Sequence, residues 1–232
     1  DGERNQLKWD TESFNRLLHF GKWIFFSSAL YIFYMQGDRL ILGKLMTLEQ
    51  LGIYTVALML SEAVNSLTLK FSHSVLYPAF TRTLQNDPTH LTSVINKSRL
   101  GIDALFIFSI GILMHLGENL VHLIYDNRYA DAGWMLNILC VRLLMSAMLI
   151  SSEVCLFAIG QAQYATFQNA VRVIWIFTCV PIAWSMYGLR GVVWAVSLTE
   201  VPVLIVLWTG LYRNGLFSLM RELRSLIFFA GG

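Results

Sequence analysis

The chain has 232 residues, 56% of them hydrophobic and only 14% charged, and its formal net charge is +2 at pH 7. A soluble domain carries about a quarter charged residues, so this composition excludes an ordinary soluble protein, and the small net charge argues against a nucleic-acid partner. In lipid only helices and closed barrels satisfy their own backbone, and the sequence lacks the polar–apolar alternation of barrel strands. We therefore predict an all-α fold, a polytopic bundle of membrane-spanning helices.

A polar stretch leads into a long apolar region. Residues 1–19 mix charges of both signs and form a predicted cytoplasmic lead-in, which ends in a short amphipathic helix on the membrane surface, Phe14–Phe20. Residues 213–232 alternate basic and apolar side chains and are predicted to form a second cytoplasmic surface helix. Between them, residues 20–212 are predicted to contain six spanning helices, at about 20–36, 50–76, 101–116, 132–159, 164–187 and 189–212.

The connection after the first span contains a glycine followed by an acid–base pair. Charged side chains at the ends of apolar helices extend toward the water interface, so this connection is predicted to lie at the membrane surface. We expect its residues to have a structural role, as a turn that fixes the mouth of the bundle: Gly37, Asp38, Arg39 and Gly43.

Prolines mark other predicted ends and bends. The second span is predicted to stop at Tyr77-Pro78, before a polar loop at residues 81–98. Pro181 in the fifth span is expected to kink it, and Pro202 lies within the sixth.

Basic residues predict the orientation. If the N-terminus is cytoplasmic, most of the 17 Lys and Arg residues fall on the cytoplasmic side, as the positive-inside rule requires. An even number of spans then places both chain ends in the cytoplasm.

Several charges interrupt the predicted spans. Each would cost about 2.5–3.5 kcal/mol if it faced lipid, so we expect these side chains to face the bundle interior. Arg142, Ser146 and Glu153 share one face of the fourth helix, and Gln168 and Arg172 share one face of the fifth. A face of the second helix runs from Glu62 through Lys70 to Tyr77, and Glu200 lies in the sixth. Such polar stripes are typical of a hydrated cavity; the alternative is that the charges pair only to hold helices together.

No pattern in the sequence points to catalysis or to a cofactor. Cys140, Cys155 and Cys179 all lie in apolar runs, where cysteine packs as a small side chain. The histidines show no metal-ligand spacing, no Ser, Cys or His arrangement indicates a nucleophile, and no phosphate-binding glycine loop is present. We therefore expect neither an enzyme nor a metal or cofactor site.

Four segments, in order, resemble the polysaccharide and O-antigen flippases, which share a superfamily with the multidrug and toxin extrusion transporters. They are Gly37–Lys44 with Leu51-Gly52-Ile53-Tyr54, then Tyr77–Arg82, Tyr125–Leu136 and Gly188–Val192. The family has twelve or more helices in two six-helix lobes around a central cavity. Six predicted spans and the absence of an initiating Met then imply the second lobe of such a transporter, partnered by an N-terminal lobe.

The resemblance implies a function in lipopolysaccharide O-antigen or exopolysaccharide biosynthesis. The expected activity is movement of an undecaprenyl-diphosphate-linked oligosaccharide across the bacterial inner membrane by alternating access. From polarity and position, the residues expected to bind substrate are Arg142, Arg172, Gln168, Ser146 and Tyr77. Glu62, Glu153 and Glu200 are the residues expected to bind a coupling cation or proton.

Two alternatives stay open. The first is a drug or cation antiporter of the same superfamily, which an aromatic cavity with one lone carboxylate would favour, whereas several cavity arginines favour an anionic lipid. The second is a membrane enzyme acting on lipid-linked sugar, which the short predicted outside loops make less suitable.

Overall fold

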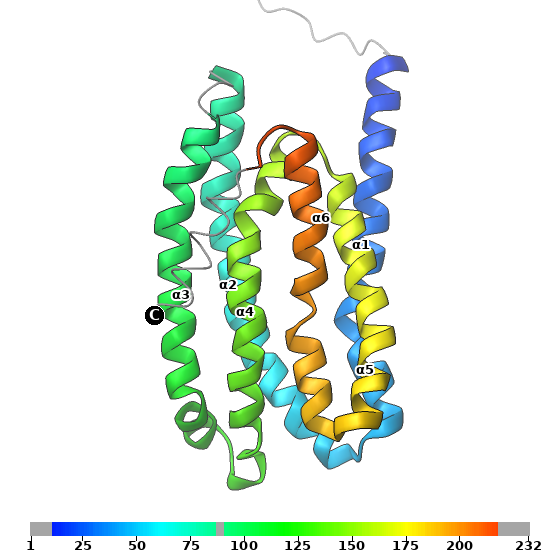
Figure 1. Cartoon of the computed structure of the whole chain (residues 1–232), viewed down its shortest axis with the longest axis vertical. Helices are drawn as coiled ribbons and strands as arrows, with labels where there is room; N and C mark the ends of the chain where they lie inside the picture. The colour runs from blue at the N-terminus through cyan, green and yellow to red at the C-terminus, as the bar shows by residue number, and fades with distance from the viewer. Residues whose placement is uncertain (1–10, 87–90, 218–232) are drawn as a thin grey trace, which may run out of the picture.

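The computed structural model describes residues 11–86 and 91–217. Every regular element in this part of the chain is helical, which confirms the predicted all-α class (Figure 1). The elements are α1 Thr11–Leu45, α2 Leu48–Asn86, α3 Leu91–Ile124, the short 3-10 helix η2 Asn127–Tyr129, α4 Ala132–Ala158, α5 Gln163–Ser197 and α6 Glu200–Arg213.

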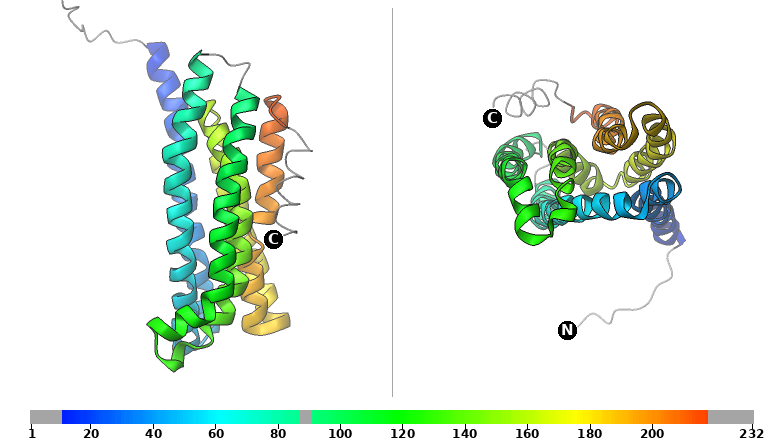
Figure 2. Two further views of the ribbon diagram at one scale, coloured as in Figure 1. Left: turned by 90° about the vertical axis from the view of Figure 1, so that its left-hand side faces the viewer. Right: turned by 90° about the horizontal axis from the view of Figure 1, so that it is seen from below.

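Consecutive helical rods run antiparallel, and α4 lies at the centre of the bundle (Figures 1 and 2). α4 contacts α2 and α3 on one side and α5 and α6 on the other. α1 packs mainly along α5 and barely touches α2. The helices therefore form two groups that meet at α4, and the polar residues described below lie between them.

Within the described ranges, four stretches are long and apolar enough to cross a membrane: Leu48–Asn86, Ala104–Ile124, Ala132–Ala158 and Gln163–Arg213. The last of these reverses direction at Gly188, and each of its arms is about 37 Å long at 1.5 Å per residue, enough to cross a bilayer. α1 is not among the four stretches, although its 35 residues pack along α5. This arrangement is a polytopic helical membrane bundle.

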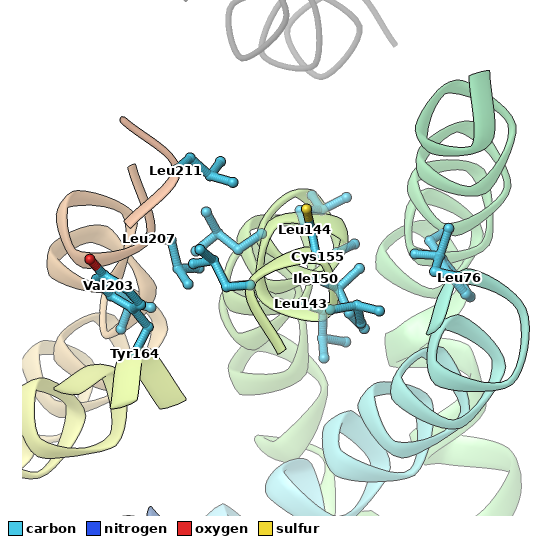
Figure 3. Close-up of a cluster of buried hydrophobic side chains, with 14 of the residues drawn as sticks. Leu76, Leu143, Leu144, Ile150, Cys155, Tyr164, Val203, Leu207 and Leu211 are labelled. Carbon is cyan, nitrogen blue, oxygen red and sulfur yellow. The ribbon is translucent and has the colours of Figure 1, made fainter. Parts of the chain in front are cut away.

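The central position of α4 rests on apolar packing along its length. Figure 3 shows Leu143, Leu144 and Ile150 of α4 between Leu76 of α2 and Leu207 of α6. All five side chains are buried. Lipid tails are as apolar as leucine, so in a membrane such contacts hold helices together through close packing more than through exclusion of water.

The chain direction of α5 reverses at a residue whose backbone conformation only glycine adopts readily. Gly188 has φ 59° and ψ −143°, which is non-helical and sterically unfavourable for residues with a Cβ atom. Three residues later, a Cβ on Gly191 would lie 2.5 Å from the carbonyl oxygen of Ala183. Glycine at both positions lets the two arms turn and then touch.

Proline explains a second interruption, between α5 and α6. Pro202 has no N–H to donate to the carbonyl of Leu198, so the N–H of Val201 donates to that oxygen instead, at 3.1 Å. The N–H of Thr199 donates to the carbonyl of Val196 at 3.3 Å, and the indole N–H of Trp175 donates to the carbonyl of Ala195 at 2.8 Å. The backbone groups released by the break are thus satisfied inside the bundle, as an apolar environment demands.

The predicted turn at Gly37 is wrong. α1 continues through Gly37, Asp38, Arg39 and Gly43 and ends at Leu45. Gly37 instead allows close approach of α5, because a Cβ there would lie 3.0 Å from the Phe177 ring. The turn lies at Met46 and Thr47.

A capping box fixes the true start of the second helix. The Thr47 hydroxyl oxygen accepts a hydrogen bond from the Gln50 N–H, and the Gln50 side-chain oxygen accepts one from the Thr47 N–H, both at 3.2 Å. This reciprocal pattern satisfies two N–H groups that a helix N-terminus would otherwise leave free.

Other predicted ends fall short of the observed helices. α2 continues through Pro78 to Asn86, and α3 begins at Leu91, so most of the predicted polar loop is helical. The predicted surface helix Phe14–Phe20 is continuous with α1. Helix extension keeps backbone groups bonded at little cost, which outweighs local polarity and one proline. Residues 1–10 and 218–232, parts of the predicted lead-in and tail, lie outside the described residues.

Candidate functional site

A polar cavity of about 100 Å³ lies between the two helix groups. Side chains from α1, α2, α4, α5 and α6 line it, and they include both buried arginines of the bundle's described part. Its lining residues are Ser27, Tyr31, Tyr34, Met35, Asn65, Leu69, Arg142, Ser146, Glu153, Ala165, Gln168, Asn169, Arg172 and Glu200.

Arg142 of α4 joins three helices. Its guanidinium donates to the hydroxyl of Tyr34 on α1 at 3.0 Å and to the hydroxyl of Ser61 on α2 at 3.4 Å. It also forms a salt bridge with Glu62 of α2. The arginine is 5% exposed, so its charge is neutralised inside the bundle and not by water.

The Glu62 carboxylate carries this network further. It accepts a hydrogen bond from the side-chain amide of Asn65 at 3.3 Å, and Asn65 in turn accepts one from the Ser146 hydroxyl at 3.3 Å. Ser146 lies on the same face of α4 as Arg142, so the series of contacts begins and ends on α4 and passes through α2. α2 and α4 are therefore held together by polar groups at the depth of the cavity.

Arg172 of α5 is paired with Glu200 of α6. Two of its nitrogens donate to the two carboxylate oxygens, at 3.1 and 2.8 Å, in the bidentate geometry that gives the strongest arginine–carboxylate pairs. A third nitrogen donates to Asn169 at 3.0 Å. Glu200 lies in the first turn of α6, where the helix dipole also stabilises a negative charge.

Tyr34 lies between the two ion pairs. Its hydroxyl accepts the hydrogen bond from Arg142, and its ring faces the guanidinium of Arg172 at 5.6 Å from the ring centroid. Asn169, beside Arg172, donates to the carbonyl and hydroxyl oxygens of Ser27 at 3.1 and 3.0 Å. The two ion pairs thus hold α1 in place through Tyr34 and Ser27.

Glu153 differs from the other two carboxylates. It lines the cavity from α4, half-buried, and makes no hydrogen bond or salt bridge with any residue in the described ranges. Gln168, from α5, is 1% exposed, and its side-chain oxygen also lacks a partner in the described part of the chain. Within the described part of the chain, the Glu153 carboxylate and the Gln168 side-chain oxygen therefore face this cavity without a donor.

The structure brings together most of the residues predicted to form a site. Arg142, Arg172, Gln168, Ser146, Glu153 and Glu200 line one cavity, and Glu62 lines a small adjoining one of about 20 Å³ that Arg142 shares. Their roles in binding or coupling stay predictions.

Tyr77 does not join them. It lies about 22 Å beyond Glu62 along α2 at 1.5 Å per residue, and its ring packs against Phe157 at 5.9 Å. Lys70, which shares the predicted stripe with both residues, is exposed on α2. The stripe thus leaves the cavity after its first turn.

Several residues that build the site are not among those predicted from the sequence. Asn169 lies one turn before Arg172, a spacing at which helical side chains interact. The contact between these two residues is therefore predictable from the sequence. The sequence does not indicate a role for Tyr34, because aromatic residues are common in apolar membrane spans. Asp38 was expected at the membrane surface, but it is 6% exposed and accepts a hydrogen bond from the Tyr54 hydroxyl at 2.7 Å, which links α1 to α2.

Together, the fold and the site describe a helical membrane protein in which the buried residues Arg142, Arg172 and Glu200 face an internal cavity. The sequence profile of a family described as polysaccharide biosynthesis protein matches residues 3–133, more than half of the chain. The chain belongs to this family of polysaccharide biosynthesis proteins, which is of the transporter type. No curated protein and no solved structure matches the chain significantly.

The match covers α1 to α3 and η2, whereas Arg142, Glu153, Arg172 and Glu200 lie beyond it. Among residues 11–86 and 91–217, no three His, Cys, Asp or Glu side chains converge as a metal site would require. The polar side chains that line the cavity offer hydrogen bonding and charge.

Replacing Arg172 by Met leaves Glu200 buried without its partner. Breaking a buried pair on one side costs about 3–5 kcal/mol, so we expect the free energy of unfolding in detergent to fall by that amount. Arg172→Met combined with Glu200→Gln removes both charges and is expected to recover most of the loss.

Arg128→Met is the matched control. Arg128 pairs with Asp126 at 3.5 Å, but both side chains are largely exposed, so its loss is expected to cost less than about 1 kcal/mol. Equal losses for Arg172→Met and Arg128→Met would show that the Arg172 pair does not hold the bundle.

Proposed function

We propose that this chain forms the substrate-gating part of a transporter that moves an undecaprenyl-diphosphate-linked oligosaccharide across the bacterial inner membrane. The observation that carries the proposal is the cavity with two arginines, each already neutralised by a glutamate, beside a third glutamate that is not. Family membership supports lipid-linked sugar as the substrate class.

The arginines bind substrate by exchanging partners. A diphosphate offers the same bidentate geometry as a carboxylate and a larger negative charge, so it competes with Glu62 for Arg142 and with Glu200 for Arg172. Each exchange releases a contact between helices, α2 to α4 or α5 to α6. Substrate binding thereby loosens the contacts that keep the cavity closed.

The size of the cavity supports this order of events. A volume of about 100 Å³ accommodates a few water molecules and no oligosaccharide. The substrate therefore enters only after the helix groups separate. α1 and α2, which barely touch, are the helices between which the cavity opens most easily.

Glu153 is the coupling site in this proposal. Glu62, Glu153 and Glu200 face two arginines, so one bound proton or monovalent cation at Glu153 balances the charge of the site. The free side-chain oxygen of Gln168 supplies a second ligand for a cation or accepts the hydrogen bond of a protonated carboxyl. Cation binding and substrate binding then act on the same charge network.

A second lobe is the partner that covers α1 and α2. On α2, Ser66, Lys70 and His73 are exposed, and polar side chains of this kind are expensive against lipid. A neighbouring lobe with water between the two provides a suitable environment. The O-antigen or exopolysaccharide role, the inner membrane and cytoplasmic chain ends belong to the same proposal.

One observation favours a different function, cation or drug antiport. Among the described residues, Glu153 is the cavity carboxylate without an ion-pair partner, and the cavity also contains the rings of Tyr31 and Tyr34, which suit an organic cation. The variants below separate the two functions.

Arg142→Lys keeps the charge but loses the planar fork that binds two oxygens. We expect export of labelled lipid-linked oligosaccharide to fall about tenfold or more, the effect of losing one charged hydrogen bond. Export is measured in cells expressing the intact transporter, with membrane protein levels checked in parallel. Arg128→Lys, outside the cavity, is the control, and undiminished export by Arg142→Lys at equal protein level would remove Arg142 from the mechanism.

Glu153→Gln retains the shape of the side chain and breaks no ion pair with the residues that the structure describes, so the protein is expected to reach the membrane at normal levels. We expect oligosaccharide export to lose its response to an imposed proton or sodium gradient, because the titrating or cation-binding carboxylate is gone. If this variant instead loses resistance to cationic drugs and exports oligosaccharide normally, the antiport function is correct and the proposed one is not.

A further inference from the structure

A second concave surface lies at the end of the bundle that carries the Gly188 turn. It is an apolar groove of about 490 Å³ between the two arms of α5, within the usual size range of ligand pockets. Ile182 and Met186 line it from the first arm, and Arg190 and Trp194 from the second. Cys179 lies deeper along the first arm.

The turn itself shapes this groove. Gly188 reverses the chain, and the contact between Gly191 and Ala183 brings the arms together at the floor. Larger side chains then diverge on either side: Ile182 is 58% exposed, Met186 64% and Trp194 46%. The groove is therefore open to the surroundings and has a rigid base.

Aromatic side chains place this end of the bundle at a membrane surface. Tyr125, Tyr129, Trp134, Trp184 and Tyr187 all lie in the segments that meet there. Trp and Tyr are enriched at the boundary between lipid headgroups and hydrocarbon. The groove thus runs from the headgroup level into the hydrocarbon region.

Arg190 gives the groove a polar end. It is exposed, its guanidinium lies 5.7 Å from the centroid of the Trp134 ring, and it has no carboxylate partner among the described residues. A lone guanidinium at the headgroup level attracts a phosphate, to which it donates two parallel hydrogen bonds.

We propose that this groove is a binding site for one anionic phospholipid. One acyl chain lies along Ile182, Met186 and Trp194, and Arg190 binds the phosphate. Apolar lining, location at the headgroup level and an unpaired cation at the mouth together match such a lipid better than a neutral one. The site is separate from the polar cavity and does not depend on the function proposed for it.

The test uses the full chain in phosphatidylcholine vesicles that contain a small fraction of phosphatidylglycerol with a photoactivatable acyl chain. After irradiation, we expect the label on residues 179–195. The same acyl chain on phosphatidylcholine is expected to label these residues about tenfold less, because its choline cation offsets the phosphate charge and is repelled by Arg190. Phosphatidylglycerol with Arg190→Gln is expected to show a similar loss, because the charged hydrogen bond to the phosphate is missing.

Two further variants make the outcome specific. Arg128→Gln removes an exposed arginine at the same end of the bundle and is expected to leave the labelling unchanged. Ile182→Trp fills the groove and is expected to lower labelling by both lipids. Equal labelling by the two lipids, label outside residues 179–195, or indifference to Arg190→Gln would overturn the proposal. So would a second copy of the chain crosslinked at the groove, or displacement of the label by undecaprenyl diphosphate.

Discussion

An arginine buried in an apolar bundle must be neutralised where it stands, and the structure depends on how this is done. Burial removes most of its contact with bulk water, so the partner must come from another helix and the remaining donors must also be satisfied. Arg142 and Arg172 each bind one glutamate, and Tyr34 contacts both guanidinium groups. These two sites therefore fix the relative positions of all the cavity-lining helices, and the apolar contacts of α4 fill the space around them.

The break between α5 and α6 is part of the same arrangement. Pro202 interrupts the helix inside the bundle, and this places Glu200 in the first turn of α6, directed at Arg172. The indole N–H of Trp175 donates a hydrogen bond to the Ala195 carbonyl, one of the backbone groups beside the break. A continuous helix would bury the same glutamate without the favourable dipole of a helix N-terminus. The proline thus contributes to the ion pair and supplies a position where the helix bends.

The helical bundle and the inward orientation of the charges were predictable from the sequence, because both follow from the cost of exposing polar groups to lipid. Which glutamate pairs with which arginine was not, since the partners are 80 and 28 residues apart and only the packed fold joins them. The turn predicted at Gly37 is wrong because a glycine before two charges resembles a membrane-surface connection, whereas the Thr47–Gln50 capping box marks where the second helix begins. Tyr77 shares a helix face with Glu62, but a periodic pattern does not show where along a 39-residue helix the cavity ends.

The central claim is that the two arginine–glutamate pairs keep the cavity closed and that substrate opens it by exchanging their partners. Spin labels on the exposed residues Phe33 of α1 and Lys70 of α2 report this opening directly as a distance, in a protein whose native cysteines have been replaced. Without substrate we expect one short distance, and with lipid-linked oligosaccharide a second, longer distance that Arg142→Lys suppresses. A single distance distribution that does not respond to substrate would contradict the account.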